Sequence, residues 1–331
     1  MEDNSNTNFS RKERVFAFIE TTRPYTLLWC GLVSLAGACI ANGSFPNFDI
    51  ALFTTFIPIM GWIAGLSLSD FFDRRLDQIQ KNHRPIPSGR IKSYEILIIG
   101  AFFALVGLFL SYSLGINNLI ISVFAGVLVL SYAKFSKSRG MIGNINRGLI
   151  TGVAFFFGVF SIYDSIIAIP LYIGLVSLIF IIHDINSNLI GAIRDVKGDK
   201  IGGYMTFPVK YGIKKSIYFA LFLTFIWISL AFFIPYIYGF LNDIYYLLLA
   251  IVVLIVLIIY LCCFRSLDTV SRKKALRAHE FFVIERITLA SAFIFGISKI
   301  FDALIIYLIA VSITIILQYF FRGRYEFGEE I

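Results

Sequence analysis

The sequence predicts an all-α protein, a polytopic transmembrane helical bundle of nine to ten spans with ten preferred, and three observations lead to this fold class. The chain of 331 residues is 58% hydrophobic and only 15% charged, and its mean hydropathy of +0.81 lies far above the soluble globular range. Its apolar runs are continuous and about 20 residues long, which suits membrane-spanning helices rather than alternating barrel strands. Its lysines and arginines are confined to alternate loops.

Ten apolar segments give the predicted helices in chain order. They lie near residues 24–43, 49–70, 95–115, 117–134, 147–163, 167–188, 215–238, 244–264, 281–298 and 303–321. No linker rich in serine, glycine or proline divides the chain into soluble domains. We therefore expect a cytoplasmic N-terminal segment (1–23), a single transmembrane domain (24–321) and a cytoplasmic tail (322–331).

The positions of the basic residues predict the topology. Of the 29 lysines and arginines, 28 fall before the first segment, after the last one, or in every second loop, and Lys299 is the exception. Short cytoplasmic loops carry such an excess, so both termini are expected in the cytoplasm of a multi-pass protein of the cell membrane. The net charge of +8 then reflects topology and attraction to anionic lipid, which argues against a nucleic-acid partner.

Two acidic clusters follow the second and sixth segments, and the predicted topology places both on the cytoplasmic side. Asp73 and Asp77 share a D-x-x-x-D spacing with Asp195 and Asp199, which is about one helical turn and turns each pair the same way. Ser69 extends the first stripe by a further turn, and Asp70 is expected on the same broad face. Carboxylates on two facing helix ends suit Mg²⁺, which takes one or two carboxylates together with waters and phosphate oxygens.

The end of the sixth segment is unusually polar. Asp184, Asn188, Asp195 and Asp199 are spaced by four, seven and four residues, which keeps one helix face polar. Polar groups at membrane depth normally face a cavity or each other. We expect this face to form a wall of an active-site chamber, while an alternative is that His183 and Asp184 satisfy each other within the bundle.

Two basic loops are candidate phosphate-binding elements. In residues 81–90 two prolines stiffen the backbone and Arg84 is a fixed cation for a phosphate. Lys134 and Lys137 follow the fourth segment. They could present fixed cations to a phosphate, but charge alone favours ordinary loops of the positive-inside kind.

These motifs resemble the UbiA-type intramembrane prenyltransferase family, whose first motif is N-D-x-x-D-x-x-x-D and whose second is D-x-x-x-D followed by a segment with glycine, threonine and proline. The matching residues are Asp70, Asp73, Asp77, Asp195, Gly198, Asp199, Gly202, Thr206, Pro208 and Gly212. The loop at 84–89, the Arg23-Pro24 pair, and Tyr132 with Lys134 are similar to further landmarks of the family. The resemblance covers roughly residues 15–300.

The resemblance implies that the protein binds an isoprenyl diphosphate through Mg²⁺. The implied metal-binding residues are Ser69, Asp70, Asp73, Asp77, Asp195 and Asp199. The expected diphosphate-binding residues are Arg84, Lys134, Lys137 and Lys200. Asp184 and Tyr132 are expected to be catalytic, and Arg23 and Asn188 to contact the acceptor. Three features depart from the family pattern: Ser69 replaces the asparagine, Arg194 precedes Asp195, and a tenth span is added to the usual nine.

The expected activity is transfer of the isoprenyl group to an aromatic, quinone-precursor-like or other small acceptor, with release of diphosphate. A terpene cyclase that uses the same metal apparatus without an acceptor is an alternative. A transporter is a third possibility, although it would place charges in mid-membrane rather than at one boundary. The identity of the acceptor, the length of the prenyl chain and the oligomeric state do not follow from the sequence.

Overall fold

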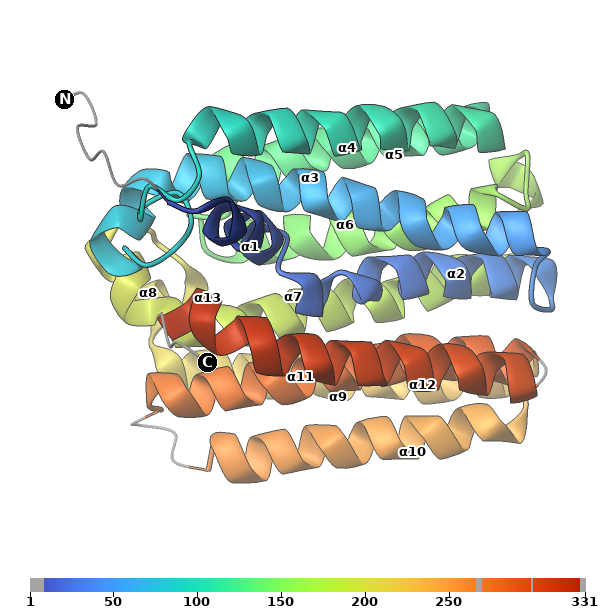
Figure 1. The fold of residues 1–331 in the computed structure, drawn as a ribbon. Coiled ribbons are helices and arrows are strands. Elements are labelled where there is room, and N and C mark those ends of the chain that lie inside the picture. Colours follow the sequence, from blue (N-terminus) through green and yellow to red (C-terminus); the bar gives the residue numbers. More distant parts are fainter. Residues whose placement is uncertain (1–8, 266–269, 299, 328–331) are drawn as a thin grey trace.

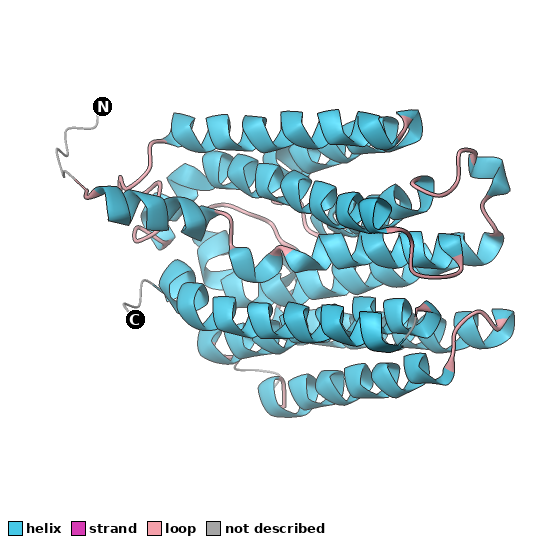
Figure 2. Ribbon diagram, turned by 45° about the vertical axis from the view of Figure 1, so that its right-hand side comes forward, coloured by secondary structure: helices cyan, strands magenta, loops and turns pink. Residues whose placement is uncertain are grey.

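A computed structural model describes residues 9–265, 270–298 and 300–327, and this part of the chain consists of helices joined by loops, with no strand (Figures 1 and 2). The long helices run side by side from one end of a bundle to the other. They are α2 (Leu28–Asn42), α3 (Phe48–Gln80), α4 (Ser93–Leu114), α5 (Ile116–Ser131), α6 (Met141–Phe160), α7 (Leu171–Ile201), α9 (Ile213–Tyr238), α10 (Asp243–Ile258), α11 (Arg272–Ile297) and α12 (Ile300–Leu317). Three shorter helices complete it, namely α1 (Arg11–Thr21), α8 (Phe207–Tyr211) and α13 (Gly323–Phe327).

Each of the ten predicted apolar segments overlaps one of these long helices, which confirms the all-helical fold class. Within the described residues eight helices are long and apolar enough to cross a membrane, or nine if the bent pair of Arg11–Thr26 and Leu28–Asn42 counts as one span. Helix α11 is not among the eight, because Glu280, Glu285 and Arg286 interrupt its apolar half. The number of membrane crossings therefore remains a prediction.

The first and last described helices lie at the same end of the bundle (Figure 1). Arg324 of α13 forms an ion pair with Glu20 of α1, so the two helices are in contact. The described part of the predicted tail (322–331) packs against the bundle, since Arg322 and Tyr325 are only 1% exposed, and its cytoplasmic location stays a prediction. Sequence hydropathy could not reveal this packing because the partners are polar groups of distant helices: Arg322 donates to His279 and the Tyr325 hydroxyl donates to Asp70.

Helices α3 and α7 are longer than a bilayer requires. They contain 33 and 31 residues, which corresponds to about 50 and 46 Å, compared with about 30 Å for the hydrocarbon core. Their last turns therefore extend beyond the apolar region at the end of the bundle that also holds α1, α8 and α13 (Figure 1). These turns carry the two acidic clusters.

Helices α2 and α6 pack with their backbones in close contact. A Cβ added to Gly158 would lie 1.8 Å from the carbonyl oxygen of Ser34, and one added to Gly37 would lie 2.3 Å from that of Phe155. Small residues allow such close backbone approach in membrane bundles. The four cysteines are free thiols.

The connection before α2 is bent. Arg23 has φ of 44°, a left-handed conformation that is unusual for a residue other than glycine. Its side chain is held by an ion pair with Asp70 and donates a 2.6 Å hydrogen bond to the hydroxyl of Tyr325. These contacts direct Arg23 and the following residues toward the acidic ends of α3 and α7.

Candidate active site

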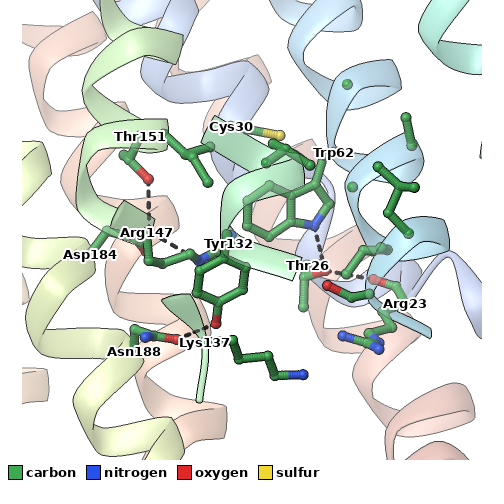
Figure 3. Close-up of a pocket in the computed structure, with 18 of the residues that line it drawn as sticks. Arg23, Thr26, Cys30, Trp62, Tyr132, Lys137, Arg147, Thr151, Asp184 and Asn188 are labelled. Atoms are coloured by element: carbon green, nitrogen blue, oxygen red, sulfur yellow. Dashed lines mark hydrogen bonds and ion pairs between the residues drawn. The ribbon is translucent and has the colours of Figure 1, made fainter. Parts of the chain in front are cut away.

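One large cavity of about 610 Å³ lies inside the bundle. Its walls come from α3, α4, α5, α6, α7 and α11, with further residues from the segment before α2 and from α13. One end is lined by charged side chains and the other by apolar ones. Figure 3 shows the middle of the cavity, where Trp62, Tyr132, Arg147 and Asp184 converge from four helices.

The acidic stripe of α3 faces the cavity, with one exception. Ser69, Asp73 and Asp77 line it, as expected for residues spaced by one turn. Asp70 does not line it: its carboxylate pairs with Arg23 and accepts a hydrogen bond of 3.1 Å from the hydroxyl of Tyr325. Since Asp70 is rotated by about 100° from Ser69 on the helix, the predicted common face does not hold for it.

The acids of α7 lie across the cavity from those of α3. Asp195 accepts hydrogen bonds from Arg194 at 2.7 Å and from Lys81 at 3.4 Å. Asp199 accepts one of 3.0 Å from the hydroxyl of Thr206. All four residues of the predicted polar face, Asp184, Asn188, Asp195 and Asp199, line the cavity, so the structure brings them together as expected.

The two lysines that follow α5 differ in position. Lys137 lines the cavity and forms an ion pair with Asp73, whereas Lys134 is exposed beside the Phe135 ring. A π-helical turn over Tyr132–Ser136 explains the difference. In this turn the backbone N–H of Lys137 donates a 3.2 Å hydrogen bond to the carbonyl of Tyr132, so residues five apart, rather than four, lie on the same side of the helix. Lys200, also predicted to bind diphosphate, is exposed and is not part of the cavity wall.

The charge of Lys137 is secured by its surroundings. Burial opposes protonation, but the Asp73 carboxylate with Tyr132 and Tyr204 raises the pKa of Lys137 above its ordinary value. Burial and the same carboxylate raise the pKa of Tyr204, whose hydroxyl donates a 3.0 Å hydrogen bond to Asp73. Lys137 is therefore a protonated lysine paired with Asp73.

Replacing Lys137 with alanine is expected to lower kcat by about 30-fold, somewhat less than the loss of a sole charge-stabilising donor, because other cations line the same end. Lys134→Ala is the matched control and should retain wild-type kcat, since that side chain is exposed. Steady-state kinetics of both purified variants measure the difference. Equal losses in the two variants would contradict the assignment.

The C-terminal helix contributes an acid to the charged end. Glu326 of α13 is 4% exposed and pairs with Arg194 at 3.0 Å, with Lys81 at 3.6 Å and with Arg84 at 3.8 Å. Arg84 also donates to Asp77 at 2.8 Å. Burial, together with the neighbouring Arg84, lowers the pKa of Lys81. Glu326 thus forms ion pairs with three cations whose side chains line the cavity.

Replacing Glu326 with glutamine is expected to lower the KM of a phosphate-bearing substrate by up to about 10-fold. In the wild type the phosphate must displace Glu326 from its cations, whereas in the variant these cations are free to bind the phosphate. Initial-rate kinetics over a range of substrate concentrations measure this. Glu95→Gln, which affects a pair with Arg14 outside the cavity, is the control. A KM that is unchanged or higher in Glu326→Gln would contradict the expectation.

The middle of the cavity is a polar belt (Figure 3). The Asp184 carboxylate accepts a 2.8 Å hydrogen bond from Thr151 and lies 3.3 Å from Nε of Arg147. The Arg147 guanidinium lies 3.8 Å from the centre of the Trp62 ring. One turn further along α7, Asn188 accepts a 3.3 Å hydrogen bond from the Tyr132 hydroxyl. Both predicted catalytic residues therefore border the same space.

The far end of the cavity is an apolar slot between α3, α4, α5 and α6. Gly61, Phe103, Gly107, Gly126 and Phe157 are among the residues that line it. No atom lies within 4 Å of the position that a Cβ would take at Gly61 or Gly126. The slot is therefore wide where these glycines face it, and it suits an extended hydrocarbon chain.

Several residues of the site were missed by the sequence analysis. Arg147 was not among the predicted site residues, and Glu326 fell within the predicted tail. His183 pairs with Glu285 of α11 at 2.7 Å rather than with Asp184, because adjacent residues of a helix point in directions about 100° apart. Only the polarity of Glu285 and Arg286 within an apolar helix signalled that α11 takes part.

Comparison with known proteins gives the family. The profile of the UbiA prenyltransferase family matches residues 27–284, more than half of the chain. The chain belongs to the UbiA prenyltransferase family. It is therefore an enzyme that transfers prenyl groups, and together with its apolar helices this makes it a multi-pass integral membrane protein.

Relatives of this UbiA-family enzyme include two archaeal digeranylgeranylglyceryl phosphate synthases. The one from Sulfurisphaera tokodaii is 30% identical over 232 residues, which covers 70% of this chain and 82% of the relative. The one from Thermococcus kodakarensis is 27% identical over 202 residues, which covers 61% and 71%.

Solved structures of the family share the fold. A digeranylgeranylglyceryl phosphate synthase in membranes has a TM-score of 0.64 at 27% identity, covering 86% of this chain and 98% of that one. A UbiA homolog from Aeropyrum pernix has a TM-score of 0.69 at 15% identity, covering 80% and 96%. A homolog from Archaeoglobus fulgidus, bound to DMAPP and Mg²⁺, has a TM-score of 0.60 at 16% identity, covering 83% and 99%.

Proposed function

We propose that this UbiA-family enzyme uses Mg²⁺ to transfer a geranylgeranyl group from its diphosphate to the free hydroxyl of a glyceryl phosphate that already carries one such group. The names of the relatives support this acceptor, which replaces the aromatic one expected from the sequence. The product is a diether, and the released product is diphosphate.

The single observation that carries the proposal is the two-ended cavity. Carboxylates and cations gather at one end, and an apolar slot forms the other. An isoprenyl diphosphate has the same division, with a highly charged head and a hydrocarbon tail. The polar belt of Tyr132, Arg147, Asp184 and Asn188 lies between the two ends, where the allylic carbon and the acceptor would meet.

The residues present fit Mg²⁺. Asp73 and Asp77 face the cavity from α3, and Asp195 and Asp199 face it from α7, so two pairs of hard oxygen ligands are available. No group of three or more possible ligands is already gathered among the described residues. Mg²⁺ does not require one, since it usually takes one or two carboxylates and completes its shell with waters and phosphate oxygens. When bound, it stabilises negative charge on the departing diphosphate.

The chain's own residues account for the rest of the reaction. The bond between the allylic carbon and the diphosphate oxygen breaks, its electron pair leaves with the diphosphate, and Lys137 and Arg84 stabilise that charge. The acceptor oxygen forms the new bond to carbon. Asp184 accepts the hydroxyl proton; its bonds to Thr151 and Arg147 both end on Oδ2, so Oδ1 is the oxygen that takes it.

Aromatic side chains protect the allylic cation in this scheme. Tyr132 and Trp62 line the belt, and ring faces stabilise positive charge at close range. The apolar slot excludes water from the same carbon. We further propose that the charged end faces the cytoplasm of the cell membrane, which the alternation of basic loops supports.

The test is identification of the product. Purified protein is incubated with geranylgeranyl diphosphate and Mg²⁺, and with geranylgeranylglyceryl phosphate, an aromatic hydroxy acid or no acceptor, and the products are identified by mass spectrometry. We expect the diether phosphate only with the glyceryl phosphate. A prenylated aromatic acid would overturn the proposed acceptor, and a terpene formed without an acceptor would favour the cyclase.

A further inference from the structure

A second polar wall of the cavity has no part in the reaction described above. It consists of Tyr25, Ser187, His279 and Arg286, here called the α11 pocket, and all four residues line the cavity. Arg286 of α11 donates a hydrogen bond of 3.3 Å to Ser187 of α7. Two turns earlier on α11, Nε2 of His279 lies 3.7 Å from the position of a Cβ on Gly191, one turn after Ser187. The two helices thus face each other along this wall.

Arg286 is a buried cation without a carboxylate partner. It is 3% exposed, and no carboxylate of the described residues pairs with it, because Glu285 bonds to His183 and Asp184 bonds to Arg147. By contrast, Arg23, Lys81, Arg84, Lys137, Arg147 and Arg194 all pair with an acid. A buried, unpaired guanidinium is costly, and arginine cannot shed its proton to avoid the cost.

The other groups of the α11 pocket are also hydrogen-bond donors. Nε of Arg286 and the hydroxyl of Tyr25 have no hydrogen-bond partner although both are buried. His279 accepts a 2.5 Å hydrogen bond from Arg322 on Nδ1, so its proton lies on Nε2. The four residues therefore combine a fixed positive charge with several donors and include no acid, and the two nearby carboxylates of the cavity wall, Asp184 and Glu326, are already paired with Arg147 and Arg194. This composition suits an anion site.

We propose that the α11 pocket binds the phosphate of the acceptor. The diphosphate of the donor belongs to the acidic end, where Asp73, Asp77, Asp195 and Asp199 would hold a metal that neutralises its charge. Ser187 precedes Asp195 by eight residues on α7, about 12 Å along the helix, so the two anions occupy separate places. The proposal takes the acceptor from the proposed function, whereas the anion site itself stands on the geometry of these four residues.

The first experiment measures binding and does not depend on turnover. Thermal unfolding of the detergent-solubilised protein is followed with geranylgeranylglyceryl phosphate and with the matching alcohol, geranylgeranylglycerol. We expect the wild type to bind the phosphate at least about 10-fold more tightly than the alcohol. Arg286→Met should erase this preference and Arg286→Lys should retain part of it. Arg90→Met, which removes an arginine paired with Glu20 outside the cavity, should keep it in full.

The melting temperature without ligand separates a binding role from a structural one. Removing an unpaired buried charge should leave Arg286→Met as stable as the wild type or more so, whereas a structural arginine would leave it less stable. In turnover assays, Arg286→Met should raise the acceptor KM at least about 10-fold with the donor KM unchanged.

Three results would overturn the α11 pocket. They are a wild type that binds phosphate and alcohol equally, a phosphate preference that survives in Arg286→Met, and a loss of donor affinity equal to the loss of acceptor affinity. If Arg286→Met does not fold, Arg286→Lys decides the question. A phosphate preference and an acceptor KM in Arg286→Lys that both equal those of the wild type would overturn the α11 pocket. A phosphate preference without any turnover would retain the pocket and refute the proposed function instead.

Discussion

Replacing Asp199 with asparagine is expected to lower kcat by about 10³-fold or more. Asp199 lines the charged end of the cavity and receives a hydrogen bond from Thr206 at 3.0 Å. Among the described residues no cation pairs with it, in contrast to Asp73, Asp77 and Asp195. An oxygen ligand and a negative charge are lost, while asparagine can still accept the bond from Thr206.

This asymmetry makes Asp199 a sharper test than the other acids. Losing Asp73 would leave the partly buried Lys137 without its partner, which destabilises the protein as well as the metal site. Asp199→Asn should therefore unfold at the wild-type temperature, and that measurement is made beside the kinetics. Asp164→Asn, in the exposed loop between α6 and α7, is the control. Turnover within about 10-fold of wild type in Asp199→Asn would refute the metal assignment.

Replacing Gly61 with leucine is expected to change the preferred donor. Gly61 lines the apolar slot, and no atom lies within 4 Å of the position of its Cβ, so a leucine side chain fills space that a long prenyl tail would use. The ratio of kcat/KM for geranylgeranyl diphosphate over dimethylallyl diphosphate should fall by about 10²-fold, because a misplaced tail shifts the reacting carbon.

The helix itself should tolerate this change, since leucine has a higher helix propensity than glycine. Gly174→Leu is the matched control: Gly174 lies within α7, also has no atom within 4 Å of its Cβ position, and does not line the cavity. Competition assays with the two donors give the ratio directly. A ratio that is unchanged in Gly61→Leu, or that falls equally in Gly174→Leu, would show that the slot does not hold the tail.

Most of the helical architecture could be predicted from the sequence, because a membrane span must satisfy its backbone internally and must be apolar over its whole length. The spacing of Asp73, Asp77, Asp195 and Asp199 also led to a shared space, since residues four apart on a helix share a face. The features that depend on regular helical periodicity were therefore predicted well.

The remaining features depend on local irregularity or on distant packing. Lys137 rather than Lys134 faces the cavity because of a π-helical turn, and periodicity cannot reveal an extra residue in one turn. Glu326 and Tyr325 reach the site only because α12 returns the chain to the same end of the bundle. The partner of His183 is Glu285, 102 residues away in the sequence, so no local pattern could identify it.

The central claim is that a metal-dependent acidic end and an acceptor act in one cavity, and release of diphosphate tests it most directly. Purified protein is given geranylgeranyl diphosphate with either Mg²⁺ or a chelator, and with or without geranylgeranylglyceryl phosphate. We predict release only when both Mg²⁺ and the acceptor are present, with one diphosphate formed for each diether. Release that is equally fast without the acceptor, or in the presence of the chelator, would contradict the account.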